Sequence, residues 1–164
     1  MTLTASMPRA TVEGIDDARA LLNQVVGPSQ WREVTQDMIN RFAELTGDDQ
    51  WIHVDVERAA RESPFKTTIA HGNLTLSLID GMRKELSSWG GGFKLGVNYG
   101  WNKVRFPAPV LVGSRLRCFT EVVEISDVGG GWHQITTRVT VEAEGLEKPV
   151  CVADSVGRVL VDEG

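Results

Sequence analysis

The segment HGNLTLSLIDGMRKELSS, residues 71–88, constrains the fold more than any other part of the chain. Read with helical periodicity, its large apolar side chains cover more than half of the circumference: Leu74, Leu76, Leu78, Ile79, Met82 and Leu86. A helix that is apolar on so many sides has to be buried by other elements. The rest of the chain must therefore supply a surface broad enough to wrap around this helix.

The carboxyl-terminal half predicts that surface. The segment 131–143 alternates strictly, because His133, Ile135 and the next odd-numbered positions are set between polar residues. Four strands joined by short connections favour an antiparallel sheet. They are predicted at 94–106, 114–126, 131–143 and 149–161. A short strand in SQWREVT, residues 29–35, brings the count to five and predicts an α+β fold, a curved sheet around one helix.

Two further helices are predicted in the amino-terminal half. Residues 15–26 form an amphipathic pattern, with Asp16 or Asp17 placed to cap its start and Gly27 to end it. The second helix runs from its cap, Thr35, to Gly47, which suits a left-handed end. Its apolar stripe is Met38, Ile39, Phe42, Ala43 and Leu45. The connection 47–66 is predicted to be irregular, and connections of that length are usually functional.

The length and charge of the chain limit its organisation and its partners. A chain of 164 residues is most simply one domain, 1–164, with 1–27 as an amino-terminal helical extension. The net charge of -5 argues against nucleic acid as the main partner, since phosphate binding needs clustered Lys and Arg.

The chain also lacks the sequence features of export. The start, MTLTASMPRATVEG, has no apolar core of signal-peptide length, and nowhere do 18 apolar residues run together. We therefore expect a cytosolic protein that does not enter a membrane. Cys118 and Cys151 have no metal-type spacing and lie in strand patterns, which predicts two buried free thiols.

Chemistry is suggested by GDDQWIHVD, residues 47–55, where Asp48 and His53 are five positions apart beside an apolar pair. Taken alone, an Asp after a helix-ending Gly is more often a solvated turn residue, and a lone His is more often structural. Their spacing, together with AHG at residues 70–72 opening the buried helix, favours a catalytic pair.

These residues resemble the MaoC-like hydratase/dehydratase family of single-domain hotdog folds, which are related to (R)-specific enoyl-CoA hydratases. The resemblance covers residues 28–161 and is most specific in GDDQWIH and in IAHGNLTLSLI, with NYGWNKVRFPAPVLVG also typical. The usual pattern is G-D-x-N-P, an aliphatic residue and His, so Gln50 and Trp51 depart from it. A nodulation-protein-N-like branch has a similar QWIH.

The resemblance implies (R)-specific hydration of a trans-2-enoyl thioester to a (3R)-3-hydroxyacyl thioester, and the reverse dehydration. It implies that Asp48 and His53 activate the water and that the backbone N–H of Gly72 binds the thioester oxygen. The carrier is coenzyme A or acyl carrier protein, no cofactor is needed, and the chain forms a homodimer. The alternatives are a hotdog acyl-CoA thioesterase and a non-catalytic acyl-thioester-binding subunit.

Several other residues have weaker claims to the site. Trp51 is a candidate for contact with an acyl chain, and Lys103 and Arg105 for contact with the phosphates of coenzyme A, although exposed strand residues look the same in sequence. His71 is more readily given a structural role at the helix start. Three histidines without ligand spacing predict no metal site.

Overall fold

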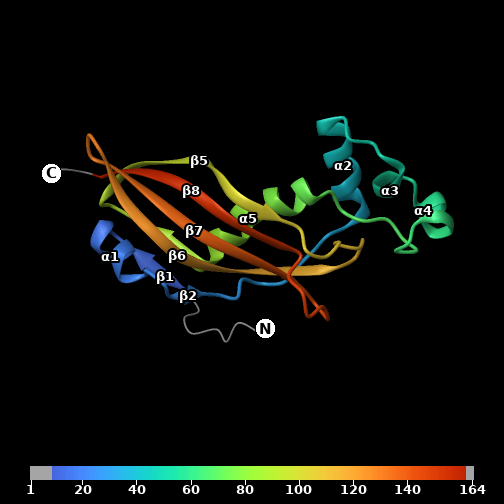
Figure 1. Ribbon diagram of the computed structural model, residues 1–164, viewed down its shortest axis with the longest axis horizontal. Helices are drawn as coiled ribbons and strands as arrows, with labels where there is room; N and C mark the ends of the chain where they lie inside the picture. Colours follow the sequence, from blue (N-terminus) through green and yellow to red (C-terminus); the bar gives the residue numbers. More distant parts are fainter. Residues whose placement is uncertain (1–8, 162–164) are drawn as a thin grey trace.

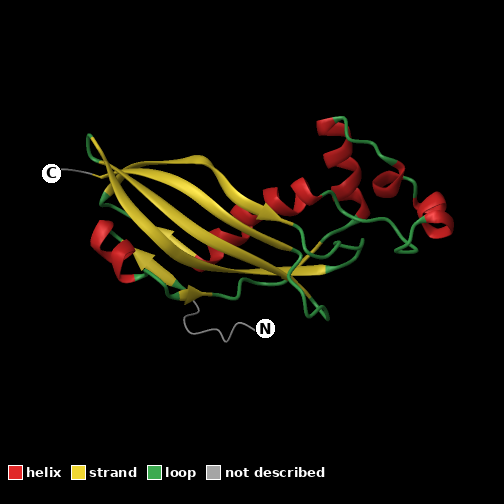
Figure 2. Ribbon diagram, in the orientation of Figure 1, coloured by secondary structure: helices red, strands yellow, loops and turns green. Residues whose placement is uncertain are grey.

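A long helix, α5 (Gly72–Leu86), lies against a curved antiparallel sheet in the computed structural model, which describes residues 9–161 (Figure 1). The strands of the sheet are β2 (Val25–Val26), β3 (Arg32–Glu33), β5 (Phe93–Arg105), β6 (Arg115–Gly129), β7 (Trp132–Ala143) and β8 (Cys151–Val161). They are ordered β2–β6–β7–β8–β5, and β3 also pairs with β6. Figure 2 shows the sheet curving around the helix. The predicted α+β hotdog architecture is confirmed.

The sheet has six strands where the sequence predicted five, because part of a predicted helix is a strand. Helix α1 (Ile15–Ala20) is shorter than the predicted 15–26, and Val25 and Val26 pair with β6 instead. Asn23 takes a positive φ of 60°, which ends any helical path, and β-branched valines favour strands. The helix begins after Gly14, so neither Asp16 nor Asp17 is its N-cap.

Helix α5 is buried along the face that meets the sheet. Leu74, Ile79, Met82 and Leu86 are each at most 6% exposed. They join one core cluster with residues from several strands, among them Leu116, Cys118, Val139 and Val141. Leu76 and Leu78 are half-buried at the edge of this cluster. The apolar pattern of the helix therefore reflects burial by the sheet on one side and partial cover on its flanks.

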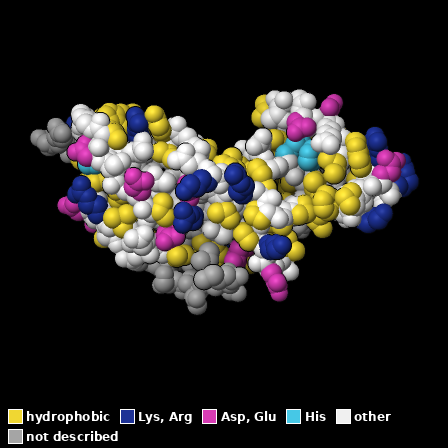
Figure 3. Space-filling model, viewed as in Figure 1, with side chains coloured by type: hydrophobic (Ala, Val, Ile, Leu, Met, Phe, Trp, Pro, Cys, Tyr) yellow, Lys and Arg dark blue, Asp and Glu magenta, His cyan; other side chains and the backbone are white. Residues whose placement is uncertain are grey.

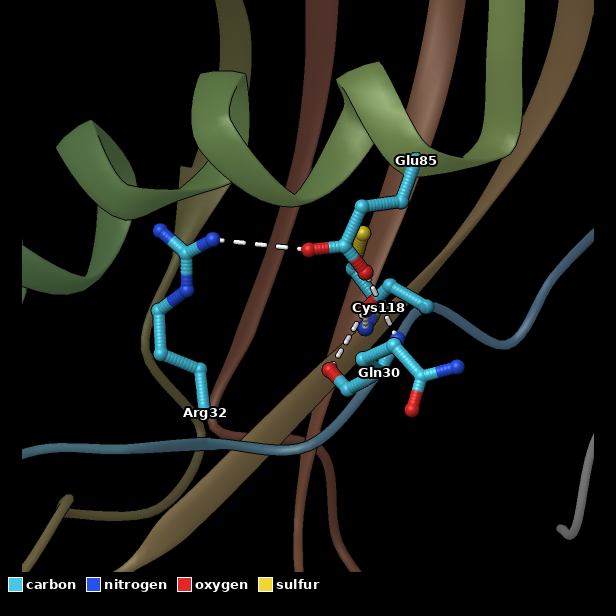
Figure 4. Close-up of polar contacts among 5 residues, drawn as sticks. Gln30, Arg32, Glu85 and Cys118 are labelled. Atoms are coloured by element: carbon cyan, nitrogen blue, oxygen red, sulfur yellow. Dashed lines mark hydrogen bonds and ion pairs between the residues drawn. The ribbon is translucent and has the colours of Figure 1, made fainter.

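Polar contacts connect the segment before β3 to both α5 and the sheet (Figure 4). The Glu85 carboxylate of α5 accepts hydrogen bonds from the backbone N–H of Gln30, at 2.8 Å, and from Arg32 Nη2, at 3.4 Å. The Cys118 N–H donates to Ser29 Oγ at 3.0 Å. Cys118 and Cys151 are buried free thiols, as predicted, and burial raises the pKa of each to about 11.

Three helices project beyond one end of the sheet, next to the start of α5 (Figures 1 and 2). They are α2 (Gln36–Thr46), α3 (Trp51–Val54) and α4 (Val56–Glu62). We call residues 36–66 the helical projection. The predicted ends of α2 are confirmed, since Thr35 Oγ1 accepts from the Met38 N–H and Gly47 has a left-handed φ of 75°.

Two predictions for the helical projection are wrong. The connection 47–66 contains α3 and α4, which are too short to show an apolar period and depend instead on local bonds such as that from the Arg58 N–H to the Asp55 side chain. Leu45 does not share the buried stripe of α2, because its side chain is 84% exposed.

The amino-terminal segment adds a second, small sheet that the sequence did not predict. Strand β1 (Ala10–Val12) pairs in parallel with β4 (Ser87–Trp89), which directly follows α5. Val12 of β1 is fully buried. No helix among residues 9–161 is both long and apolar enough to cross a membrane.

We predict that shortening one core side chain of α5 has a large effect on stability. Ile79→Ala should lower the free energy of unfolding by about 2–5 kcal/mol, since Ile79 is fully buried and the change leaves a cavity. Leu45→Ala on exposed α2 is the matched control and should change it by about 0.5 kcal/mol or less. Urea denaturation measures both, and equal effects would contradict the assignment of α5 as the core helix.

Candidate active site

Asp48 lies on the turn that links α2 to α3, and His53 lies within α3. Gly47 ends α2 in the left-handed region, and the chain then turns so that Asp48 is exposed. His53 is the third residue of α3 and is 8% exposed. The turn and the helix that follows it thus bring together one solvated carboxylate and one buried imidazole.

The His53 ring is held in a defined tautomer. Its Nδ1 is 2.7 Å from the backbone carbonyl oxygen of Ile69. A carbonyl can only accept, so Nδ1 carries the hydrogen, and Nε2 of the neutral ring is left as the proton acceptor. The backbone carbonyl of His53 in turn accepts from Gln36 Nε2 at 2.8 Å, and the Ile69 N–H donates to the Ile52 carbonyl. Helix α3 is therefore fixed on two sides.

His71 is the third member of the cluster, although the sequence predicts a structural role for it. Its Nε2 donates to the backbone carbonyl of Asp48 at 2.8 Å, and its ring stacks on His53 with centroids 3.8 Å apart. The Phe42 ring packs against it at 5.1 Å. His71 is 3% exposed, and its Nδ1 has no hydrogen-bond partner in the described part of the chain. The sequence feature that could have indicated that His71 belongs to the site is its position directly before Gly72, at the helix start.

Asp48, His53 and His71 come close enough to raise the question of a metal ion. One potential ligand atom from each lies within 4.8 Å of the others. However, the two imidazole planes are only 26° apart and stacked, and an imidazole binds a metal in its own ring plane. One ion cannot lie in two stacked planes. The arrangement suits proton transfer better than metal binding.

Gly72, the first residue of α5, lies directly against the Phe106 ring. A Cβ at this position would be 2.8 Å from ring atoms of Phe106, which follows β5. The N-cap residue, His71, makes no side-chain cap bond, so the first N–H groups of α5 keep the outward direction of an uncapped helix start. This start lies next to the imidazole pair because His71 and Gly72 are adjacent.

The other candidate residues are spread around this cluster. Trp51 is half-buried at the start of α3, where the Arg58 guanidinium lies 4.5 Å from its ring. It occupies the first helical position, which also suits the proline of the usual pattern, so the departure at this residue preserves the turn. Lys103 and Arg105 are exposed near the end of β5, and Lys103 has a positive φ of 53°.

The surface of the helical projection combines apolar side chains with charged ones. Figure 3 shows histidine side chains reaching the surface there, between hydrophobic side chains and an acidic group. Exposed apolar residues on or next to the projection are Leu45, Val56, Phe65, Phe106 and Leu111. An exposed carboxylate and a nearly buried imidazole beside exposed apolar side chains fit a site for a ligand that has both a reactive polar group and a hydrocarbon part.

Comparisons with known proteins agree on one family. The sequence pattern described as "MaoC like domain" matches residues 17–144. The chain is 51% identical to 3-hydroxyacyl-thioester dehydratase Z of Mycobacterium tuberculosis, over 90% of this chain and 97% of that protein. It is 40% identical to nodulation protein N of Rhizobium leguminosarum, over 89% and 91%. The structure of R-hydratase PhaJ1 from Pseudomonas aeruginosa has a TM-score of 0.63 at 25% identity, covering 87% and 83%.

We predict that the hydrogen bond from His71 to Asp48 contributes to stability. His71→Phe keeps an aromatic ring for stacking but leaves the Asp48 carbonyl without its donor, and should cost about 1–3 kcal/mol. His133→Phe is the matched control, since Nδ1 of half-buried His133 has no partner among the described residues. If urea denaturation gives equal losses for both variants, the hydrogen bond does not hold the turn.

Proposed function

Because this chain belongs to the MaoC-like dehydratase family, we propose that it adds water to a trans-2-enoyl thioester to give a (3R)-3-hydroxyacyl thioester, and catalyses the reverse dehydration. One observation carries the proposal for the site: the Asp48 carboxylate and a His53 ring nitrogen approach within 4.8 Å beside the start of α5. That spacing suits two groups that share one water molecule.

The proposed step uses the two side chains in different ways. His53 Nε2 takes a proton from the water, since Nδ1 already donates to the Ile69 carbonyl and keeps the ring oriented. The Asp48 carboxylate accepts the water's second hydrogen and aims its oxygen at the β-carbon. As the new C–O bond forms, the C=C electron pair moves toward the thioester oxygen. The proton then returns from the pair to the α-carbon, on the same face.

The negative charge that develops on the thioester oxygen needs a hydrogen-bond donor. We assign that role to the Gly72 N–H, which is at the positive end of α5 and lacks an intrahelical acceptor. One such donor is typically worth about 3–4 kcal/mol in the transition state. The Phe106 ring packed on Gly72 keeps the helix start in place and excludes water from one side.

The wider setting of the reaction belongs to the same proposal. The substrate is carried by coenzyme A or acyl carrier protein, with Trp51 offered to the acyl chain and Lys103 and Arg105 to the carrier's phosphates. The chemistry needs no cofactor, since both proton transfers are made by Asp48 and His53. We place the reaction in the cytosol, with no nucleic-acid or membrane partner.

We also propose that the chain works as a homodimer that forms along β5. This strand is at one edge of the sheet and pairs only with β8 among the described strands. A strand of 13 residues with an unpaired edge invites pairing with another copy. Its apolar side chains Leu95, Val97 and Tyr99 are 41–59% exposed. A two-fold axis across β5 would cover them.

We predict that substitution of Asp48 or His53 lowers the rate of hydration, whereas substitution of the neighbouring Asp49 does not. Asp48→Asn and His53→Gln should each lower kcat for hydration of crotonyl-CoA by about 100-fold or more, because the first removes the charged oxygen that holds and aims the water and the second removes the proton acceptor. Asp49→Asn is the matched control: Asp49 is exposed and adjacent, and this variant should keep nearly the full rate. Loss of the enoyl absorbance measures the rate, and chiral analysis should identify the (3R) product.

The same assay tests the two rival functions. Release of free thiol without loss of the double bond would favour a thioesterase. Binding of acyl-CoA without turnover at any chain length would favour a non-catalytic subunit. Folded Asp48→Asn and His53→Gln variants that work at the parent rate would overturn the assignment of the pair while leaving the reaction itself in place.

We predict that a charge on β5 disrupts the dimer. Val97→Asp should shift the protein toward monomer in analytical ultracentrifugation, since it would place a charge on the apolar surface that the second copy covers. Leu146→Asp, on the exposed turn between β7 and β8, is the control and should leave the mass unchanged. A Val97→Asp protein that remains dimeric would exclude β5 as the interface.

A further inference from the structure

A large cavity lies at the opposite end of α5 from Asp48 and His53. It has a volume of about 780 Å³ and is lined by the last turns of α5, by β4 and by parts of β5, β7 and β8. Its lining includes Arg83, which is eleven residues after Gly72 and therefore about 16 Å further along the helix axis. This volume is in the range of cavities that bind small organic molecules.

Arg83 brings a guanidinium group to the lining of this cavity. Its Nη1 donates to Ser155 Oγ of β8 at 2.9 Å, and the same nitrogen is 3.9 Å from the Asp80 carboxylate. Desolvation lowers the pKa of Arg83, whose side chain is 28% exposed and so is only partly withdrawn from solvent. An arginine has five N–H donors, and both of these contacts use Nη1. The other donors of the fork remain for a ligand.

The partners of Arg83 within the protein do not compensate its charge fully. Ser155 is neutral, and the Asp80 side chain is 64% exposed, so water screens an ion pair that is already long. Lys84 adds a second positive charge at the cavity lining. A partly buried cation with an incomplete counter-charge favours the binding of an anion.

Apolar side chains form one part of the lining, beside the polar and charged ones: Trp89, Phe93, Leu95, Val97, Ile135 and Val159. Trp89 and Phe93 pack their rings at 5.4 Å, and Phe93, Ile135 and Val159 belong to one hydrophobic cluster. Apolar walls of this kind suit a hydrocarbon chain, and the cationic side chains on the lining suit an anion: Arg83, Lys84, Lys94 and Arg158. A ligand that matches both features has an extended apolar body and an anionic end.

We propose that this cavity binds a hydrocarbon chain that ends in a carboxylate, with the carboxylate at Arg83 and the chain along Trp89 and Phe93. Two sources share this chemistry. One is a free carboxylic acid. The other is the far end of an acyl chain whose thioester is held by the second copy in the β5 dimer, and this source rests on the proposed function. The cavity reaches β5 between Phe93 and Asn98, at the edge where that copy would pair.

The test compares decanoate with 1-decanol, which share the chain length and differ in charge. Isothermal titration of the full chain should show decanoate binding at least about tenfold more tightly than decanol. Arg83→Met removes the charge and keeps an apolar stem, and it should abolish this preference. Arg83→Lys should retain part of it. Arg19→Met is the matched control, since exposed Arg19 on α1 lies outside the cavity, and it should behave as the parent protein.

Three results would overturn the proposal: equal binding of the two ligands to the parent protein, no saturable binding of either, or an unchanged preference in Arg83→Met. If circular dichroism shows that Arg83→Met does not fold, the proposal is tested by the preference of the parent protein and by Lys84→Met. Lys84→Met should weaken the binding of decanoate and leave the binding of decanol unchanged. Decanoate that competes with a long enoyl-CoA identifies the substrate's far end as the source; decanoate that does not compete identifies a free acid.

The outcome is separate from that of the proposed reaction. Asp48→Asn should still bind decanoate with the parent preference, because Asp48 is at the other end of α5. A protein that prefers decanoate but never hydrates an enoyl thioester refutes the proposed function alone. A protein that hydrates enoyl thioesters without distinguishing decanoate from decanol refutes the inference about Arg83 alone.

Discussion

The enclosure of α5 by the curved sheet is the constraint on which the other features depend. Leu74, Ile79 and Leu86 lose nearly all contact with solvent only if the strands bend around the helix. Once the helix is held, its two ends have fixed positions about 22 Å apart, since it has 15 residues. The amino-terminal end then faces the helical projection, and the carboxyl-terminal end faces the large cavity. The positions of the site and of the cavity both follow from the packing of α5 against the sheet.

The sequence predicts those parts of the fold in which the spacing of apolar residues follows the burial of one face. The alternation in β7 survives in the structure, where Ile135, Val139 and Val141 are buried and Arg138 is exposed. The errors fall on short elements. Val25 and Val26 continue the helical pattern of α1, and only their pairing with β6 makes them a strand. Helices of four and seven residues, such as α3 and α4, have too few turns for periodicity to appear.

The candidate site also has one part that the sequence predicts and another part that it does not. The spacing of Asp48 and His53 is local, so the sequence is enough to propose that they act together. The participation of His71 is not local, because it comes 23 residues after Asp48 and reaches it only through the tertiary contact of α5 with the α2–α3 turn. The direction of the His53 ring also depends on a distant partner, the Ile69 carbonyl. Sequence can name a proton acceptor, but only tertiary structure decides which ring nitrogen accepts.

The two ends of α5 also carry different electrostatics, and this bears on the meaning of Arg83. A helix carboxyl-terminus favours cations, so Arg83 and Lys84 in the last turns have a structural explanation that needs no ligand. That explanation predicts side chains directed at the final carbonyls of the helix. Arg83 instead donates across to Ser155 on β8, at the wall of the cavity, while its own carbonyl accepts from the Ser87 N–H. The guanidinium is oriented by the sheet, and a dipole effect alone does not account for this orientation.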